Sequence, residues 1–166
     1  MHTTEFIRRY SDLGFASSKE AIDLFNDASF REGIYHEIHH SPSQAHRPLL
    51  RELLIKEMKY REEDPDGDFF ENLYWCGFLL YRIGDVSDVA LLWQAKNVNF
   101  DTASGFDVQF LVGAGVEETI RYLQMKSDTD SRAALEYLLM SKEAGDFDDL
   151  DTWFSWRSQY FTATNA

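Results

Sequence analysis

Apolar residues recur every three or four positions along most of this 166-residue chain, which is the period of an α-helix. The clearest run follows Pro48 and consists of Leu49, Leu50, Leu53, Leu54 and Met58. Further helices are predicted over residues 17–26, 29–40, 69–83, 87–97, 106–114, 117–125, 131–144 and 148–161. Residues 98–103 are expected to form a loop. Since no convincing strand pattern is present, the predicted fold class is all-α.

Small polar residues precede several of these helices. Ser17, Ser18, Asp85, Ser87 and residues 128–131 each stand at the start of a helical run. Their side-chain oxygens can accept hydrogen bonds from the free N–H groups of a first helical turn. We therefore expect N-caps at these positions.

Three glycines, Gly84, Gly115 and Gly145, are spaced 31 and 30 residues apart, and the apolar residues around them match. The equivalent sets are Leu79, Phe110 and Met140; Val89, Ile120 and Leu150; and Leu92, Leu123 and Trp153. A period near 30 with a glycine between two apolar runs predicts stacked helical hairpins. Each glycine suits the left-handed turn that ends a helix.

A charged segment, residues 61–68, contains Pro65 and Gly67 and separates the repeats from the helices before them. We interpret it as a solvated loop because it is short. The predicted organisation is a single domain over 1–166, with N-terminal helices in 1–64 and helical repeats in 69–162.

The run Ile83-Gly84-Asp85, followed by Val89, Leu91 and Leu92, resembles the units of HEAT-like repeat proteins. The resemblance covers about residues 70–160. It implies an array of antiparallel helical hairpins that presents a surface to a partner. The later units depart from the pattern, since Val116 replaces the aspartate in one and Trp153 replaces an aliphatic residue in the other.

The net charge of −13 limits the classes of partner. An acidic surface repels nucleic-acid phosphates and anionic membranes, so neither is expected to bind. A basic protein would be attracted, although the charge can also serve solubility alone. The chain lacks a signal peptide and any long apolar run, so a cytoplasmic location is expected. The single cysteine, Cys76, is expected to be a buried core residue.

Two groups of acidic residues are the candidate partner-binding sites. The first group contains Asp64, Asp66 and Asp68, and the second contains Asp146, Asp148 and Asp149 shortly before Trp156. Carboxylates can accelerate association with a cationic partner, and an aromatic residue can anchor it. The alternative is that the carboxylates cap the last helix while its aromatic residues belong to the core.

Two further segments contain residues that could carry chemistry. His36, Glu37 and His40 fit the H-E-x-x-H zinc motif, although Pro42 ends the helix almost at once and no third ligand is evident. A solvated helix end is the favoured interpretation. Residues 97–109 form a polar segment that includes Asn99 and Asp107, for which turns and an N-cap are the favoured role.

A small, strongly acidic helical chain also resembles the immunity proteins of bacterial toxin systems. These proteins neutralise a toxin, often a basic nuclease, by covering its active site or an adjacent surface. The resemblance implies stoichiometric binding of a basic toxin domain, without catalysis and without a cofactor. The alternatives are a helical-repeat scaffold or adaptor and, as a minor one, a zinc-dependent hydrolase.

Overall fold

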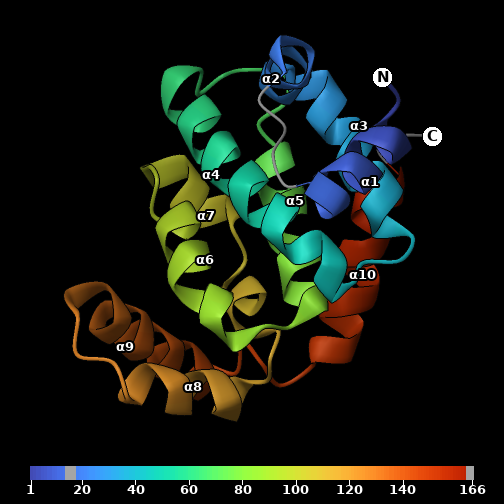
Figure 1. Cartoon of the computed structure of the whole chain (residues 1–166). Coiled ribbons are helices and arrows are strands. Elements are labelled where there is room, and N and C mark those ends of the chain that lie inside the picture. The colour runs from blue at the N-terminus through green and yellow to red at the C-terminus, as the bar shows by residue number, and fades with distance from the viewer. Residues whose placement is uncertain (14–17, 164–166) are drawn as a thin grey trace. The chain divides into compact units, whose positions relative to one another are not determined.

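The computed structural model describes residues 1–13 and 18–163, and these residues are helical with no strand. The α-helices are α1 (Thr3–Leu13), α2 (Lys19–Asn26), α3 (Ala28–His39), α4 (Arg47–Glu63), α5 (Asn72–Ile83), α6 (Val89–Lys96), α7 (Phe100–Gly105), α8 (Val116–Gln124), α9 (Thr129–Glu143) and α10 (Leu150–Ala163) (Figure 1). Short 3-10 helices lie at η1 (Gln44–His46), η2 (Val86–Asp88) and η3 (Val108–Val112). The all-α prediction is confirmed.

The chain forms two compact units, Met1–Ile83 and Gly84–Ala166, which we call the first unit and the second unit. The first predicted hairpin, α5 with α6, spans the boundary between them. The stacking of HEAT-like hairpins stays a prediction. In the described part of the chain, no helix combines the length and apolar character that crossing a bilayer requires.

The first unit is organised around α5, which is buried along most of its length. Helices α3 and α4 both pack against α5, and α1 and α2 pack against α3 (Figure 1). Cys76 on α5 is buried as expected, and its thiol donates to the carbonyl of Leu50 at 3.3 Å. Gly33 allows α1 to pack close to α3, because a Cβ at this position would lie only 3.1 Å from Thr3 Cγ2.

A charged pair is sealed in the core of the first unit. Arg31 on α3 and Glu57 on α4 form a two-point ion pair with N–O distances of 2.6 and 3.1 Å. Tyr35 donates its hydroxyl hydrogen to the same carboxylate at 2.7 Å. The remaining Arg31 nitrogen donates to the carbonyls of Phe25 and Asn26, so every nitrogen of this buried guanidinium is hydrogen-bonded.

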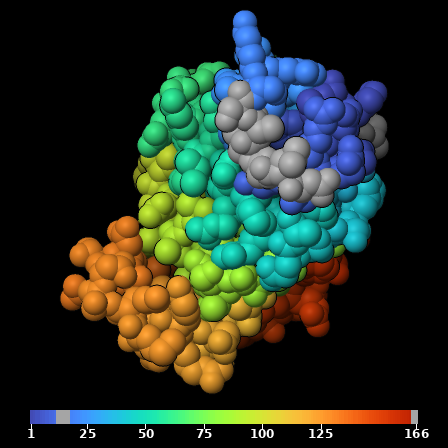
Figure 2. All heavy atoms as spheres, viewed as in Figure 1, coloured from blue at the N-terminus to red at the C-terminus, as the bar shows by residue number. Residues whose placement is uncertain are grey.

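The second unit contains an antiparallel hairpin, α8 and α9, whose surface is orange in Figure 2. The loop between these helices is short, which makes neighbouring helices antiparallel. Helix α6 contacts α9 and η3. The core is supplied by Leu92 and Ala95 of α6, Phe110 of η3, Leu123 of α8 and Leu138 of α9.

Side-chain N-caps are present at three of the predicted positions, whereas Ser87 donates its hydroxyl hydrogen to Asp85 Oδ1 at 2.6 Å. Ser18 accepts from the N–H of Ala21, Asp85 from that of Ser87, and Asp128 from that of Ser131. Each bond satisfies a free N–H at a helix start. Ser17, another predicted cap, lies outside the described residues.

All three repeat glycines have positive φ, but only two of them end helices. Gly145 follows α9 with φ 87°, and the Asp146 and Gly145 N–H groups donate to the carbonyls of Ser141 and Lys142. This is the Schellman arrangement. Gly84 follows α5 with φ 74°, whereas Gly115 has φ 108° and ψ 146° and begins α8. The prediction of a helix-ending turn is therefore wrong for Gly115.

Three other local predictions are wrong. Residues 106–114 form the short 3-10 helix η3 in place of an α-helix, and residues 98–103 overlap the short helix α7. Met140 is 64% exposed, whereas its repeat equivalents Leu79 and Phe110 are fully buried. Helix α1 is an addition, since no helix was predicted before residue 17.

Candidate protein-binding surfaces

The first predicted acidic group lies in the loop that follows α4. Asp64, Asp66 and Asp68 are all exposed, and the Asp64 N–H still donates to the last turn of α4. Gly67 packs against the Tyr60 hydroxyl and the Asp64 carboxylate, since a Cβ there would lie 2.6 Å from Asp64 Oδ2 and would displace these side-chain ends. The loop thus presents its carboxylates to solvent.

The buried side chain of Arg61 contacts residues of this acidic loop and stabilises its conformation. Its side chain is buried, its Nη1 donates to the Pro65 carbonyl at 2.6 Å, and its guanidinium lies 5.2 Å from the ring centre of Phe70. A cation over an aromatic face is stabilising. The conformation of the loop is therefore fixed from within, without the three aspartates.

The second predicted acidic group lies in the turn between α9 and α10. Asp146, Asp148 and Asp149 are exposed, and the Asp146 carbonyl accepts from Gln109 Nε2 at 2.8 Å. Asp149 Oδ1 accepts from the Thr152 N–H at 3.2 Å, as the capping interpretation predicts. The structure thus gathers each acidic group locally, with one group in each unit.

Trp156 is 55% exposed on α10, seven residues after Asp149. Seven residues make two helical turns, about 10 Å, so the two positions lie on the same side of the helix. The neighbouring exposed positions on this side include Thr152, Ser155 and Gln159. Trp153 and Tyr160, three positions before and four after Trp156, lie on the same side and are partly exposed, and the ring centroids of Trp156 and Tyr160 are 5.8 Å apart. Trp156 is therefore the most exposed member of an aromatic group that borders these polar positions.

Arg157, next to Trp156, turns inward and anchors α10. Its Nε donates to Asp107 Oδ2 at 2.8 Å, and Trp153 Nε1 donates to the same oxygen at 2.9 Å. Four rings surround the guanidinium at 5.1–5.4 Å, namely those of Phe110, Trp156, Tyr160 and Phe161. Trp156 thus combines an inner contact with Arg157 and an outer face in solvent.

The polar segment 97–109 has a structural role, as favoured from the sequence. Asn99 caps α7 by accepting from the Thr102 N–H at 2.8 Å. Lys96 is buried and donates to the carbonyls of Ala103 and Phe106 at 2.6 and 2.7 Å, and burial lowers the pKa of its ammonium group. The pairing of Asp107 with Arg157 was not foreseen, because fifty positions separate the two residues in the sequence.

The H-E-x-x-H motif lies at the end of α3 with His36 and His40 exposed. Their ring centroids are 5.4 Å apart, and Glu37 accepts a hydrogen bond from the Thr4 hydroxyl at 3.2 Å. Among the described residues, no group of three or more His, Cys, Asp or Glu side chains is arranged to hold a metal ion. The solvated helix end remains the better interpretation.

His39, within the same motif, turns into the core. Its Nδ1 accepts from Trp75 Nε1 at 3.1 Å, and its ring lies beside Phe78. Burial lowers the pKa of His39 to about 4, and the charge of Arg82 adds to this effect. The neutral ring is therefore the form that fits this position.

An apolar groove of about 290 Å³ runs along the outer side of α9. Leu135, Leu139 and Met140 form its apolar part, and Arg132, Glu136 and Glu143 line it as well. Leu139 is 45% exposed. Exposed apolar side chains bordered by charged ones are typical of protein-binding surfaces.

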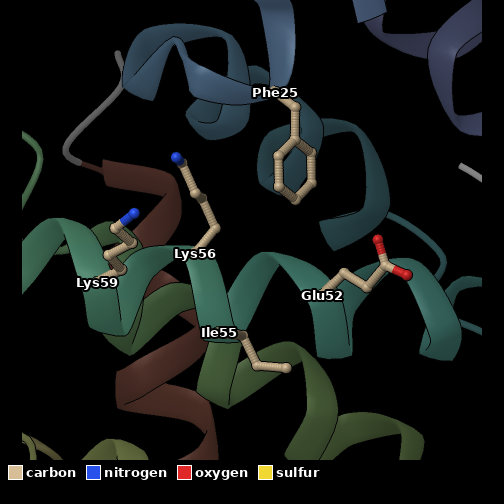
Figure 3. Close-up of a pocket in the computed structure, with 5 residues that line it drawn as sticks. All are labelled: Phe25, Glu52, Ile55, Lys56 and Lys59. Carbon is tan, nitrogen blue, oxygen red and sulfur yellow. The ribbon is translucent and has the colours of Figure 1, made fainter. Parts of the chain in front are cut away.

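A second groove, of about 240 Å³, lies in the first unit between α2 and α4 (Figure 3). It is lined by Phe25, Glu52, Ile55, Lys56 and Lys59. Sequence reasoning missed it, because the two helices come together only in the fold. The only signal in the sequence was that Lys56 and Lys59 are three positions apart, which places both on one side of a helix.

A scan against protein-family models and searches of curated proteins and of solved structures found no match to this chain. We therefore infer its function from the chemistry of its own surfaces.

Proposed function

We propose that the protein binds a basic protein partner stoichiometrically and neutralises it, as an immunity protein does a toxin. The observation that carries this proposal is Trp156, a half-exposed aromatic residue two turns after the carboxylate of Asp149. A rigid aromatic side chain on a helix loses little conformational freedom on binding and can supply much of the binding energy.

The charge distribution supports a cationic partner. The second unit carries 14 acidic and 6 basic residues, against 15 and 10 in the first unit. Long-range attraction of this kind raises the association rate and weakens as salt rises. Asp146, Asp148 and Asp149 would steer the partner, and Trp156 would then slow its dissociation.

The apolar groove on α9 gives the second unit a further contact area. Met140 and Glu143 at its end come shortly before Asp146 in the chain, so apolar and acidic positions follow one another here. A partner surface with apolar side chains next to lysine or arginine would be complementary to this sequence of positions. A toxin domain with a basic active-site surface is the partner class that the small, acidic, helical character of the chain favours.

A scaffold that holds two partners is the second candidate function. It is favoured by the presence of two compact units, each with its own exposed acidic group. Stoichiometry distinguishes the two proposals: neutralisation of one toxin predicts a single slow-dissociating partner near 1:1, whereas a scaffold predicts two partners at once.

The test is capture of partners from native cell lysate at low salt, with identification by mass spectrometry. We expect one dominant basic protein that salt releases. Trp156→Ala should weaken its binding by about 2 kcal/mol or more, the range of an aromatic hot spot. Phe100→Ala is the matched control, because Phe100 is an even more exposed aromatic residue, at 84%, of the same unit.

Equal loss of binding in the Trp156 and Phe100 variants would contradict the assignment of Trp156 as the anchor. Capture of no basic protein by the wild-type chain would contradict the proposed function itself.

A further inference from the structure

The groove between α2 and α4 combines an apolar floor with a positive charge. Figure 3 shows the ring of Phe25 pointing from α2 toward α4, with Lys56 to one side of it and Glu52 to the other. Ile55 is 54% exposed in the same groove. The lining itself is almost wholly apolar, so Lys56 and Lys59 line the groove with their aliphatic stems, and their ammonium groups border it.

The electrostatic balance at Lys56 is positive, although the whole chain is acidic. The pKa of Lys56 is lowered by burial first, and then by the charges of Arg31 and Lys59, which outweigh the opposing effects of Glu63 and Glu57. Since Arg31 is fixed in the core by Glu57, these positive charges belong to the folded structure. An anion placed beside Lys56 would relieve their repulsion.

The nearby carboxylates do not neutralise this end of the groove. Glu52 accepts a hydrogen bond from the Tyr10 hydroxyl, and burial together with this carboxylate raises the pKa of Tyr10 to about 12. Glu52 is therefore held on the far side of Phe25 from Lys56. Lys59 pairs with Glu63 at 3.6 Å, but both side chains are 64% exposed, and such pairs contribute little.

The volume of the groove limits the size of an occupant. At about 30 Å³ per water molecule in the liquid, 240 Å³ corresponds to roughly eight to ten non-hydrogen atoms. Pockets for drug-sized ligands are larger, from about 300 Å³ upward. The groove thus fits a short chain with one charged end.

We propose that this groove binds a small amphipathic carboxylate, with its anionic end at Lys56 and Lys59 and its alkyl chain against Phe25 and Ile55. The occupant is a free short-chain acid of the size of octanoate. This site is independent of the proposed partner surface in the second unit, so either can fail without the other.

The test is a titration of the isotope-labelled full-length chain with octanoate, followed by two-dimensional amide NMR. A ligand of this size is expected to bind with a Kd of the order of 1 mM. Shifts should centre on the amides of α2 and of residues 52–59 in α4. Octylammonium and octyl glucoside, which carry the same alkyl chain with a positive or neutral end, should shift these amides much less.

The variants separate the charge from the apolar floor. Lys56→Gln with Lys59→Gln should weaken octanoate binding about tenfold, and Ile55→Ser should weaken it as well. Lys126→Gln, an exposed cation of the second unit, is the matched control and should leave binding unchanged. All four positions are at least partly exposed, so folding is expected to persist, and the amide spectra of the variants report it directly.

Three results would overturn this inference. One is the absence of shifts at α2 and α4, another is equal response to all three alkyl probes, and the third is unchanged octanoate affinity in the double lysine variant. The proposed function would survive each of them, because Trp156 and the acidic turn belong to the second unit.

Discussion

The two units hold a buried arginine in different ways. In the first unit, Arg31 is sealed in the core, where Glu57 meets it at two points and Tyr35 completes the group. In the second unit, Arg157 meets Asp107 and is otherwise surrounded by aromatic rings, of which that of Trp156 reaches solvent. Both arginines pair with a carboxylate, but Arg31 lies over one ring, that of Tyr60, whereas Arg157 is surrounded by four.

This difference bears on how each unit combines stability with the proposed partner binding. Arg61 holds the backbone of the acidic loop in the first unit through the Pro65 carbonyl, so the side chains of the three aspartates are not needed for this contact. In the second unit, Trp156 contacts Arg157 on its inner side, and its outer side faces solvent, where the proposed partner would bind. We therefore expect substitutions to affect the two units unequally.

The largest effect on stability is expected from Arg31→Met. It leaves Glu57 buried without its cation, which should cost about 3–5 kcal/mol of unfolding free energy. Urea denaturation followed by circular dichroism measures this loss. Lys59→Met is the matched control, because it breaks the exposed pair with Glu63 and should cost less than about 1 kcal/mol. Similar losses in both variants would show that Arg31 is not sealed as described.

A smaller loss, about 2–3 kcal/mol, is expected from Asp107→Ala. The change leaves Trp153 Nε1 and the Arg157 guanidinium without their shared acceptor. Asp101→Ala, at an exposed position in the first turn of α7, should cost below about 1 kcal/mol. Thermal unfolding of both variants tests the contrast, and a neutral Asp107→Ala would contradict the role of this acceptor.

His39 should make the first unit sensitive to acid. Its pKa is about 4 in the folded chain against about 6.5 in the unfolded chain, so the unfolded state binds the proton more tightly. Stability should therefore fall as pH drops from about 6.5 toward 4, by about 2 kcal/mol. His39→Gln keeps an acceptor for Trp75 and should reduce this slope, as measured by urea denaturation at several pH values. An unchanged slope in His39→Gln would contradict this role of His39.

The smallest of these effects is expected at the Schellman turn. Gly145→Ala forces an L side chain into a positive φ of 87° and should cost about 1 kcal/mol. Gly113→Ala is the control, because Gly113 has φ −59° and ψ −28°, which alanine adopts readily. A thermal unfolding comparison in which Gly113→Ala is the more destabilising change would contradict the assigned backbone roles.

Local signals predicted most of the helices because they act within a few residues. Ser18, Asp85 and Asp128 cap helices as their positions predicted, and the apolar period located α4 correctly. Prediction failed where a segment contains residues that favour a helix together with residues that disfavour it. Residues 106–114 include two valines and a glycine, which disfavour an α-helix, and only η3 forms there.

Sequence spacing alone predicts neither which side of a helix is buried nor which distant residues come into contact. Met140 matches Leu79 by position, but the buried side of α9 passes through Ala134, Leu138 and Ser141, which leaves Met140 outside. The two groups of exposed aspartates could be predicted, because their members lie close together in the sequence. The Asp107–Arg157 pair and the groove between α2 and α4 could not, because both are created by contacts between distant segments.

The central claim is that the second unit carries the partner-binding surface. The most direct test compares two variants with the same change in charge: Asp146, Asp148 and Asp149 replaced by asparagine, and Asp64, Asp66 and Asp68 replaced likewise. Association rates with the captured basic partner should fall clearly more for the first variant than for the second, and the difference should shrink at high salt. Equal rates for both variants, or a larger loss in the second, would contradict the claim.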